Sequence, residues 1–263
     1  FNPRSETFSV VQFAHKPTTE RDYINSIMED AFGTLWLTTI DGLFFYDRTQ
    51  QTIQPFEQKA VSSISSLPLG GIIELGTGNT SPSERRLWIR KRGGLIEFDP
   101  LRGTSNHFNL IDTAKDKQFF YGNVVRDSSD FLWLTDLEGL YCFDPRSKSL
   151  VVHVPQESYI RQSLFKNPPK NYFTTRAAIC APNGMLWFGS TGGIVLLRYR
   201  GSPKDYDTKL LQSNDANPTS LSGDAVRALF ADKSGVIWAG GEPFGINKYT
   251  PYRQKFQLFR YLP

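Results

Sequence analysis

The sequence predicts an all-β protein, a β-propeller built from four-stranded antiparallel blades, and three observations support this class. One tryptophan phrase recurs five times, the copies lie about fifty residues apart, and strand-like runs and tight polar turns flank each copy. The phrases read FGTLWLTT, RRLWIRK, DFLWLTD, NGMLWFGS and SGVIWAGG. Their tryptophans, separated by 52, 45, 54 and 51 residues, are Trp36, Trp88, Trp133, Trp187 and Trp238.

Each repeat is expected to contain four strands in a fixed order. The first is an apolar run such as YINSIMED or AVRALFAD, and a polar turn follows it at 30–33, 127–130, 181–184 and 232–235. The tryptophan run is the second strand, the third ends in an aromatic residue, and a weaker fourth run closes the repeat. Short β-branched or aromatic runs bounded by Gly, Asp, Asn or Pro are typical of strands. The predicted repeats are 22–58, 60–110, 119–155, 172–212 and 222–261.

The tryptophans are expected to be structural. Blades of a propeller stack face to face, so the middle strands are buried on both faces and read as nearly continuous apolar runs. One indole per blade is therefore expected to pack against the next blade. Asp30, Asp127 and Asp232 recur with the turns and are expected to cap backbone amides of those turns. The glycines expected at the turn before the third strand are Gly42, Gly94, Gly139, Gly193 and Gly245.

The ends and connections of the repeats also carry predictions. Residues 1–13 match the second half of a repeat and are predicted to form the outer strand of a preceding blade, so that five full repeats follow a leading partial blade. A region cut from a larger propeller is favoured, and the alternative is that the leading strand closes another blade as a clasp. The second repeat has a lengthened hairpin loop before Arg85, and surface linkers are expected at 153–173 and 200–223.

Composition excludes several function classes. Hydrophobic content of 39% with 14% aromatic residues is sufficient for a packed core. The formal charge of +4 is a mild excess and no apolar run approaches a membrane span, so we expect no nucleic-acid partner and no membrane contact by this region. No phosphate-binding, dinucleotide-binding or zinc-binding spacing occurs, so no cofactor or metal is expected. Cys142 and Cys180 lie in apolar runs and are expected to be buried free thiols.

Two groups of residues are considered as binding sites, and the first is basic. Arg90, Lys91 and Arg92 are expected to form either a patch that binds an anion such as a uronate or sulfate, or a solvated basic loop without a ligand. His15, His107 and His153 stand alone in outer-strand or linker segments and are expected to be exposed or packed, not catalytic.

The second group follows from an analogy with other propellers, which usually bind ligands at the loop before strand one and the loop between strands two and three. Aromatic rings beside polar groups suit sugars, and the same mixture suits a protein interface. The nominated residues are Tyr23, Asn25, Arg90, Arg92, Tyr121, Asn123, Asp136, Glu138, Tyr172, Arg176, Asp224, Glu242 and Phe244.

The stretches INSIMEDAFGTLWLTTIDGLFFYD (24–47) and NPTSLSGDAVRALFADKSGVIWAGGEPFGINKYTPYRQKF (217–256) resemble the two-component regulator propeller repeat. The resemblance covers about residues 22–263 and is weakest in the second repeat. It implies the extracytoplasmic sensor region of a bacterial hybrid histidine kinase or related signalling protein, in which propellers of about seven blades are common. Many such sensors detect oligosaccharides.

Three functions are therefore considered. The leading one is a non-enzymatic periplasmic sensing module that binds a small molecule or glycan and relays binding to downstream signalling domains of the same chain. The alternative is a protein-interaction scaffold that supports a homodimer and binds no ligand of its own. The third is a carbohydrate-active or lyase-like propeller enzyme, which would require a catalytic histidine or acid on the central face.

Overall fold

The computed structural model describes residues 4–14, 24–56, 64, 67–76, 84–111, 122–163, 175–241, 245–251, 253 and 255–259. Strands dominate these residues, and the helix found among them is one short segment, α1 (Glu157–Ile160). None of the described residues forms a helix long and apolar enough to cross a membrane. The predicted fold class, an all-β propeller of four-stranded antiparallel blades, is confirmed.

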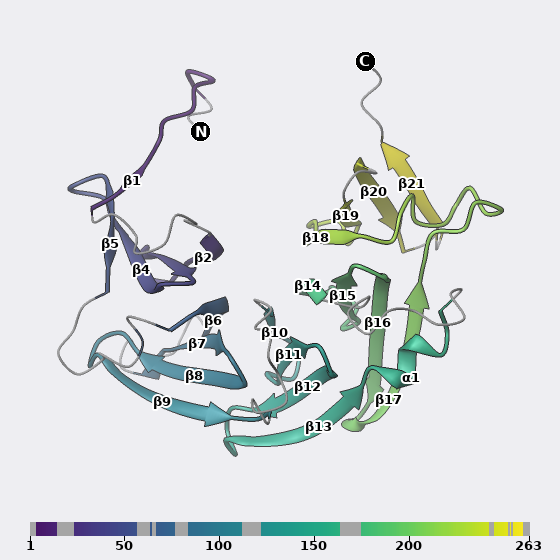
Figure 1. Ribbon diagram of the computed structural model, residues 1–263, viewed down its shortest axis with the longest axis horizontal. Coiled ribbons are helices and arrows are strands. Elements are labelled where there is room, and N and C mark those ends of the chain that lie inside the picture. The colour runs from purple at the N-terminus through teal and green to yellow at the C-terminus, as the bar shows by residue number, and fades with distance from the viewer. Residues whose placement is uncertain are drawn as a thin grey trace. The chain divides into compact units, whose positions relative to one another are not determined.

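The described strands form five sheets, which we name the first to fifth blades (Figure 1). The first blade contains β2 (Ile24–Glu29), β3 (Leu35–Thr39), β4 (Gly42–Asp47) and β5 (Thr52–Pro55), and the second contains β6 (Leu69–Leu75), β7 (Arg86–Lys91), β8 (Gly94–Asp99) and β9 (Thr104–Asn109). The third contains β10 (Val124–Arg126), β11 (Leu132–Asp136), β12 (Gly139–Asp144) and β13 (Ser149–Pro155). The fourth contains β14 (Thr175–Cys180), β15 (Leu186–Ser190), β16 (Gly193–Arg200) and β17 (Ser202–Leu211), and the fifth β18 (Val226–Ala231), β19 (Ile237–Gly241), β20 (Gly245–Thr250) and β21 (Lys255–Phe259).

Contacts divide the chain into two compact units, Phe1–Tyr121 and Gly122–Pro263. In the first unit, β2 and β3 of the first blade pack against β6 of the second. The ring of Trp36 lies 6.0 Å from that of Phe98 and 5.3 Å from that of Phe56. Trp36 is 4% exposed, so this indole joins the two blades through a buried aromatic cluster.

The second unit holds the third, fourth and fifth blades, which run from teal to yellow in Figure 1. Trp133 of the third blade stacks on Tyr199 of the fourth, with ring centres 6.1 Å apart. Trp187 of the fourth blade meets Tyr249 of the fifth edge-on at 4.9 Å. In both pairs, a tryptophan of one blade packs on an aromatic ring of the next. Trp238 of the fifth blade is only half-buried.

The turn before the third strand requires glycine in the third blade. Gly139 has φ of +141°, a conformation that residues with a Cβ rarely adopt. A Cβ there would also overlap the carbonyl oxygen of Val154 on the neighbouring strand β13. This close approach lets β12 and β13 continue pairing to the end of the blade, from Gly139 opposite Pro155.

Two connections differ from the sequence-based expectation. The segment 200–223 was expected to be a linker, but its first half forms β17, a strand of 10 residues that pairs with β16 along its length. The alternation of exposed and half-buried residues in β17 is typical of an outer strand with one solvated face. In the segment 153–173, β13 extends to Pro155 and α1 follows it, while 164–173 lies outside the described residues.

The leading segment also contributes a strand. β1 (Gln12–Phe13) pairs in parallel with β5, at the outer edge of the first blade. The assignment of residues 1–13 to a preceding blade, and the larger propeller that it implies, remain predictions. The lengthened loop of the second repeat falls at 77–83, outside the described residues.

The two thiols give a test of the core. Cys142 is free and fully buried, and burial raises the pKa of its thiol, so the reactive thiolate is scarce. Cys180 is free and half-buried. In a Cys180→Ser variant only the thiol of Cys142 remains. We expect it to react with a disulfide reagent at pH 8 only as fast as the folded chain unfolds, and to react at once when the chain is unfolded in urea. Rapid labelling of the folded variant would contradict the buried position of Cys142.

Candidate functional site

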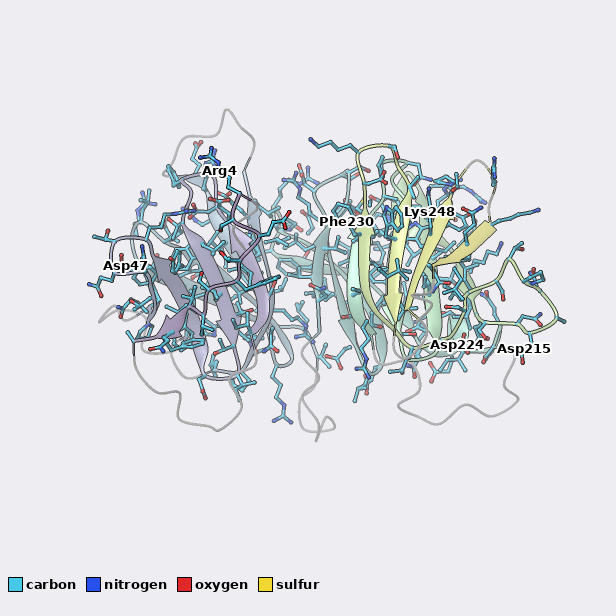
Figure 2. The ribbon with its side chains drawn as sticks, turned by 90° about the horizontal axis from the view of Figure 1, so that it is seen from above. Arg4, Asp47, Asp215, Asp224, Phe230 and Lys248 are labelled. Carbon is cyan, nitrogen blue, oxygen red and sulfur yellow. The ribbon has the colours of Figure 1, made fainter. Side chains whose placement is uncertain are left out.

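In each blade, the residues predicted to contact a ligand belong to loops at one end of that blade. In each blade the loop before the first strand and the loop between the second and third strands lie at the same end, because the strands are antiparallel. Figure 2 shows Asp224, just before β18, at this end, while Phe230 on β18 lies nearer the opposite end. Of the nominated residues, those outside the described residues are Tyr23, Tyr121, Tyr172, Glu242 and Phe244, and the side chain of Arg176 is also not described.

Most of the described nominated side chains bond to their own chain. Asn25 Nδ2 donates to the Leu69 carbonyl oxygen at 2.7 Å and so ties the first blade to the second. Asp224 Oδ1 accepts from the Ser213 amide at 2.6 Å, and Asp136 Oδ1 from the Leu137 amide at 2.7 Å. Similarly, Asn123 Oδ1 accepts from the Val124 amide at 3.0 Å. These contacts shape the loops, whereas the exposed side chain of Glu138 faces solvent.

The basic patch expected at 90–92 does not form. Arg90 is fully buried, and its guanidinium donates to the carbonyl oxygens of Lys91 and Gly94 inside its own hairpin. Lys91 is 9% exposed, and its Nζ donates to Asn109 Oδ1 at 2.5 Å. Arg92 alone of the three is exposed. The prediction that Arg90 reaches a ligand is therefore corrected: its charge is used to satisfy backbone carbonyls of the turn.

At the opposite end of the blades, an aspartate and a tryptophan six residues later form a repeated unit, which we call the Asp–Trp pair. The indole Nε1 of Trp36 donates to Asp30 Oδ2 at 2.8 Å, and Trp133 Nε1 donates to Asp127 Oδ2 at 2.7 Å. The fifth blade repeats the bond between Trp238 and Asp232 at 3.0 Å. In all three blades the other carboxylate oxygen accepts from two amides of the turn.

The third blade shows how this pair meets the next blade. The hydroxyl of Tyr199, from the fourth blade, donates to Asp127 Oδ2 at 2.9 Å while its ring stacks on Trp133. Asp127 is 4% exposed, so one buried carboxylate satisfies donors from two blades. The carboxylate is thus part of the contact between blades as well as a cap for its own turn.

The fourth blade lacks this carboxylate. Ala181 occupies the aspartate position, six residues before Trp187. Asn183 takes over part of the capping, because its Oδ1 accepts from the Met185 amide at 3.1 Å. No acceptor among the described residues reaches the Trp187 Nε1, although this indole is 2% exposed. A buried donor without a partner is rare in folded proteins and calls for an explanation.

A cavity of about 520 Å³ lies at this place, between the fourth and fifth blades. Its described lining includes Ala181, Trp187, Arg198, Tyr249 and Pro251. Leu197 pairs with Leu186 in the fourth blade, and Tyr249 pairs with Ile237 in the fifth. Because Leu186 and Ile237 each precede the tryptophan of their blade, Leu197 and Tyr249 hold equivalent positions. Tyr199 and Pro251, each two residues further on, are therefore also equivalent. Between the fourth and fifth blades the carboxylate is therefore replaced by the methyl group of Ala181, and the phenol that packs on the tryptophan comes from Tyr249, two residues before Pro251. Sequence reasoning missed the cavity, although Ala181 in place of aspartate was a visible signal.

The remaining titratable groups of the described residues bear on the histidine predictions and on the needs of a metal site. Among the described residues, no three His, Cys, Asp or Glu side chains are grouped so that they could hold a metal ion. His153 stacks on Tyr141 with ring centres 4.2 Å apart, on the outer strand β13. Burial, and then Lys91, lower the pKa of His107. His15 lies outside the described residues.

The half-buried Asp–Trp pair of the fifth blade predicts a pH dependence. Hydrogen bonds from Ser234, then Trp238, lower the pKa of Asp232 from 3.8 to about 2. A carboxyl whose pKa is lower in the folded state stabilises the fold above pH 4, and this contribution is lost as the pH falls from about 4 to about 2. We expect Asp232→Asn to lower the melting temperature at pH 6, with a smaller difference at pH 2. Asp215→Asn, at an exposed turn, is the control, and an equal effect of Asp232→Asn at both pH values would contradict the prediction.

Comparisons with known proteins bear on the fold. No protein-family model matches the sequence, and no curated protein matches it significantly. The virginiamycin B lyase of Staphylococcus aureus aligns with a TM-score of 0.60 at 12% identity, over 93% of this chain and 72% of the lyase. PorZ, a surface component of the type-IX secretion system of Porphyromonas gingivalis, aligns with a TM-score of 0.58 at 16% identity, over 86% of this chain and 32% of PorZ.

A third match is the extracellular domain of BT3049 from B. thetaiotaomicron, a protein described as a hybrid two component system. It aligns with a TM-score of 0.58 at 20% identity, over 89% of this chain. This chain spans 29% of that domain. At these identities the matches show the propeller fold.

Proposed function

We propose that this chain is a ligand-sensing propeller module from the extracytoplasmic part of a bacterial two-component signalling protein. It binds an oligosaccharide or a related small molecule and relays binding to a downstream histidine kinase. The observation that carries the proposal is the repeat itself. The phrase that resembles the sensor-type repeat supplies the second strand of every blade, and the fold is similar to the extracellular domain of BT3049.

The turns between the second and third strands suit a polar ligand in each unit taken by itself. Arg92 is exposed at this turn in the second blade and Glu138 at the equivalent turn in the third, and each can bond to sugar hydroxyls. The blades behind these turns are held rigid by buried aromatic contacts, so the loops are presented on a fixed support. Binding changes the output only when the ligand has different affinities for two states of the sensor.

A scaffold without a ligand is the second candidate, and one observation favours it. On the fifth blade Phe230 is 63% exposed and Ile246 is 50% exposed. Phe230 lies on β18 and Ile246 on β20, with β19 between them in the sheet, and apolar side chains exposed on one sheet are found at protein contact surfaces. A homodimer would bury them. An enzyme is the third candidate, since a lyase has the same fold, and its test is turnover of a sugar substrate.

Calorimetric titration of the 263-residue chain with a panel of neutral and acidic oligosaccharides tests the proposal. We expect saturable binding by at least one member, together with a melting temperature that rises with ligand concentration. Arg92→Ala tests the first unit and Glu138→Ala the second, and the variant in the unit that binds should weaken binding without changing the melting temperature of the free chain. A panel without any binder, combined with concentration-dependent dimers in sedimentation, would replace the sensor by the scaffold.

A further inference from the structure

We propose that the cavity between the fourth and fifth blades binds a small organic carboxylate, which accepts the hydrogen bond of Trp187 Nε1. The ligand's carboxylate takes the place that the side chain of Asp127 occupies in the third blade. This site is at the opposite end of the blades from the predicted ligand face, and the inference does not depend on the sensing role.

The first step is that Ala181 and Trp187 have the same places in the fourth blade that Asp127 and Trp133 have in the third, and both line the cavity. The turns of the third and fourth blades have the same backbone hydrogen bonds: Asp127 N to Phe131 O at 3.0 Å, and Ala181 N to Met185 O at 2.8 Å. Each turn is closed three residues later, by the amides of Asp130 and Gly184. The tryptophan follows after six residues in both. The Cβ of Ala181 therefore marks where the carboxylate of an aspartate at this position would begin.

The second step concerns the cost of this donor. A buried N–H that has lost its bond to water and gained no other acceptor destabilises the fold. Trp187 is as buried as Trp88, at 2% exposure, and the cavity beside it is large enough for a small ligand. An acceptor supplied from solution removes this cost, so the site favours ligands that present a strong acceptor.

The third step is the charge of the lining. Arg198 and Lys233 contribute two cationic side chains, and no acidic side chain is among the described lining residues. A carboxylate is therefore favoured over a cation or a neutral group. The wall also contains Met185, Ile237 and the ring of Tyr249. Burial raises the pKa of Tyr249, which keeps its phenol neutral. The expected ligand is thus an acid with a compact apolar or ring-shaped body.

Nuclear magnetic resonance of the ¹⁵N-labelled chain tests the proposal at the atom concerned. The five tryptophans give five indole N–H signals, and Trp187→Phe identifies the one of interest. Acetate tests whether a carboxylate group alone binds beside Trp187, phenylacetate adds an apolar ring to that group, and phenylacetamide is the neutral control. We expect saturable movement of the Trp187 signal with both acids, tighter for phenylacetate, and none with the amide or with chloride at equal ionic strength.

The chain supplies its own controls. The signals of Trp36, Trp133 and Trp238 should stay in place, because an aspartate already accepts from each indole. Ala181→Asp supplies a carboxylate from the chain itself, as in the other turns. Because this carboxylate occupies the place proposed for that of the ligand, phenylacetate binding should weaken at least about tenfold. Arg198→Gln, a change at an exposed side chain, should weaken it about two- to fivefold.

Three results would overturn the proposal. One is a Trp187 signal that responds to neither acid, which would mean that water alone satisfies the donor. Another is an equal response to phenylacetate and phenylacetamide, which would show that charge plays no part. The third is unchanged phenylacetate binding by Ala181→Asp, which would place the acid elsewhere.

Discussion

Replacing Trp133 with alanine is expected to lower the free energy of unfolding by about 3–5 kcal/mol. Trp133 is fully buried, stacks on Tyr199 of the next blade and donates to Asp127. The substitution leaves a cavity between two blades and frees a buried carboxylate from one of its donors. Equilibrium unfolding in urea, followed by circular dichroism, measures the change.

Trp238→Ala is the matched control for this prediction. Trp238 occupies the same position of the repeat and makes the same bond to an aspartate, but its ring is half-buried. Because less apolar surface is lost, its effect should be clearly smaller than that of Trp133→Ala. Equal losses for the two variants would mean that packing between blades does not explain the role of the tryptophan.

The second large effect is expected for Asp127→Ala, with a loss of about 3 kcal/mol or more in the free energy of unfolding. The carboxylate accepts from Trp133 Nε1 at 2.7 Å, from the Tyr199 hydroxyl at 2.9 Å and from two turn amides. Removing it leaves the buried indole of Trp133 and the half-buried hydroxyl of Tyr199 without their acceptor, and the turn loses its cap. The measurement is again urea unfolding.

Asp232→Ala provides the comparison for Asp127→Ala, because Asp232 caps the equivalent exposed turn and has no tyrosine from another blade bonded to it in the described residues. Its loss should be smaller. A double variant of Asp127→Ala with Tyr199→Phe should be less destabilising than the sum of the single changes, since the two side chains share one bond. Strict additivity would show that the bond between blades contributes nothing.

Much of this architecture could be predicted from the sequence because it depends on local patterns. The tryptophan phrase, the polar turns and the aromatic residue that ends the third strand each report one strand or turn. The turn aspartates were expected to cap amides, and Asp30, Asp127 and Asp232 do so. These aspartates have a second role, as acceptors for an indole six residues away. This role follows because the second strand returns along the first, and the spacing of the residues in the sequence did not reveal it.

Other features depend on contacts that a linear pattern does not report. Arg90 was expected at the surface, but the tight hairpin that follows it has carbonyls that its guanidinium can satisfy. The strand β17 has a solvated face and few strongly apolar residues, so it read as a linker. The lining of the cavity comes from two blades, with Ala181 on one and Pro251 on the other, and only the packing of the fourth blade on the fifth brings them together.

The central claim is that the turn aspartate serves as the acceptor for the indole of its own blade, and that the fourth blade lacks this carboxylate. The most direct measurement is the urea unfolding of Ala181→Asp in two backgrounds, the original chain and the Trp187→Phe variant, which has no indole N–H at this position. The account predicts that Ala181→Asp stabilises the ligand-free original chain by about 1–3 kcal/mol and gives little or no gain in the Trp187→Phe background. No stabilisation in the original chain, or the same gain in both backgrounds, would contradict it.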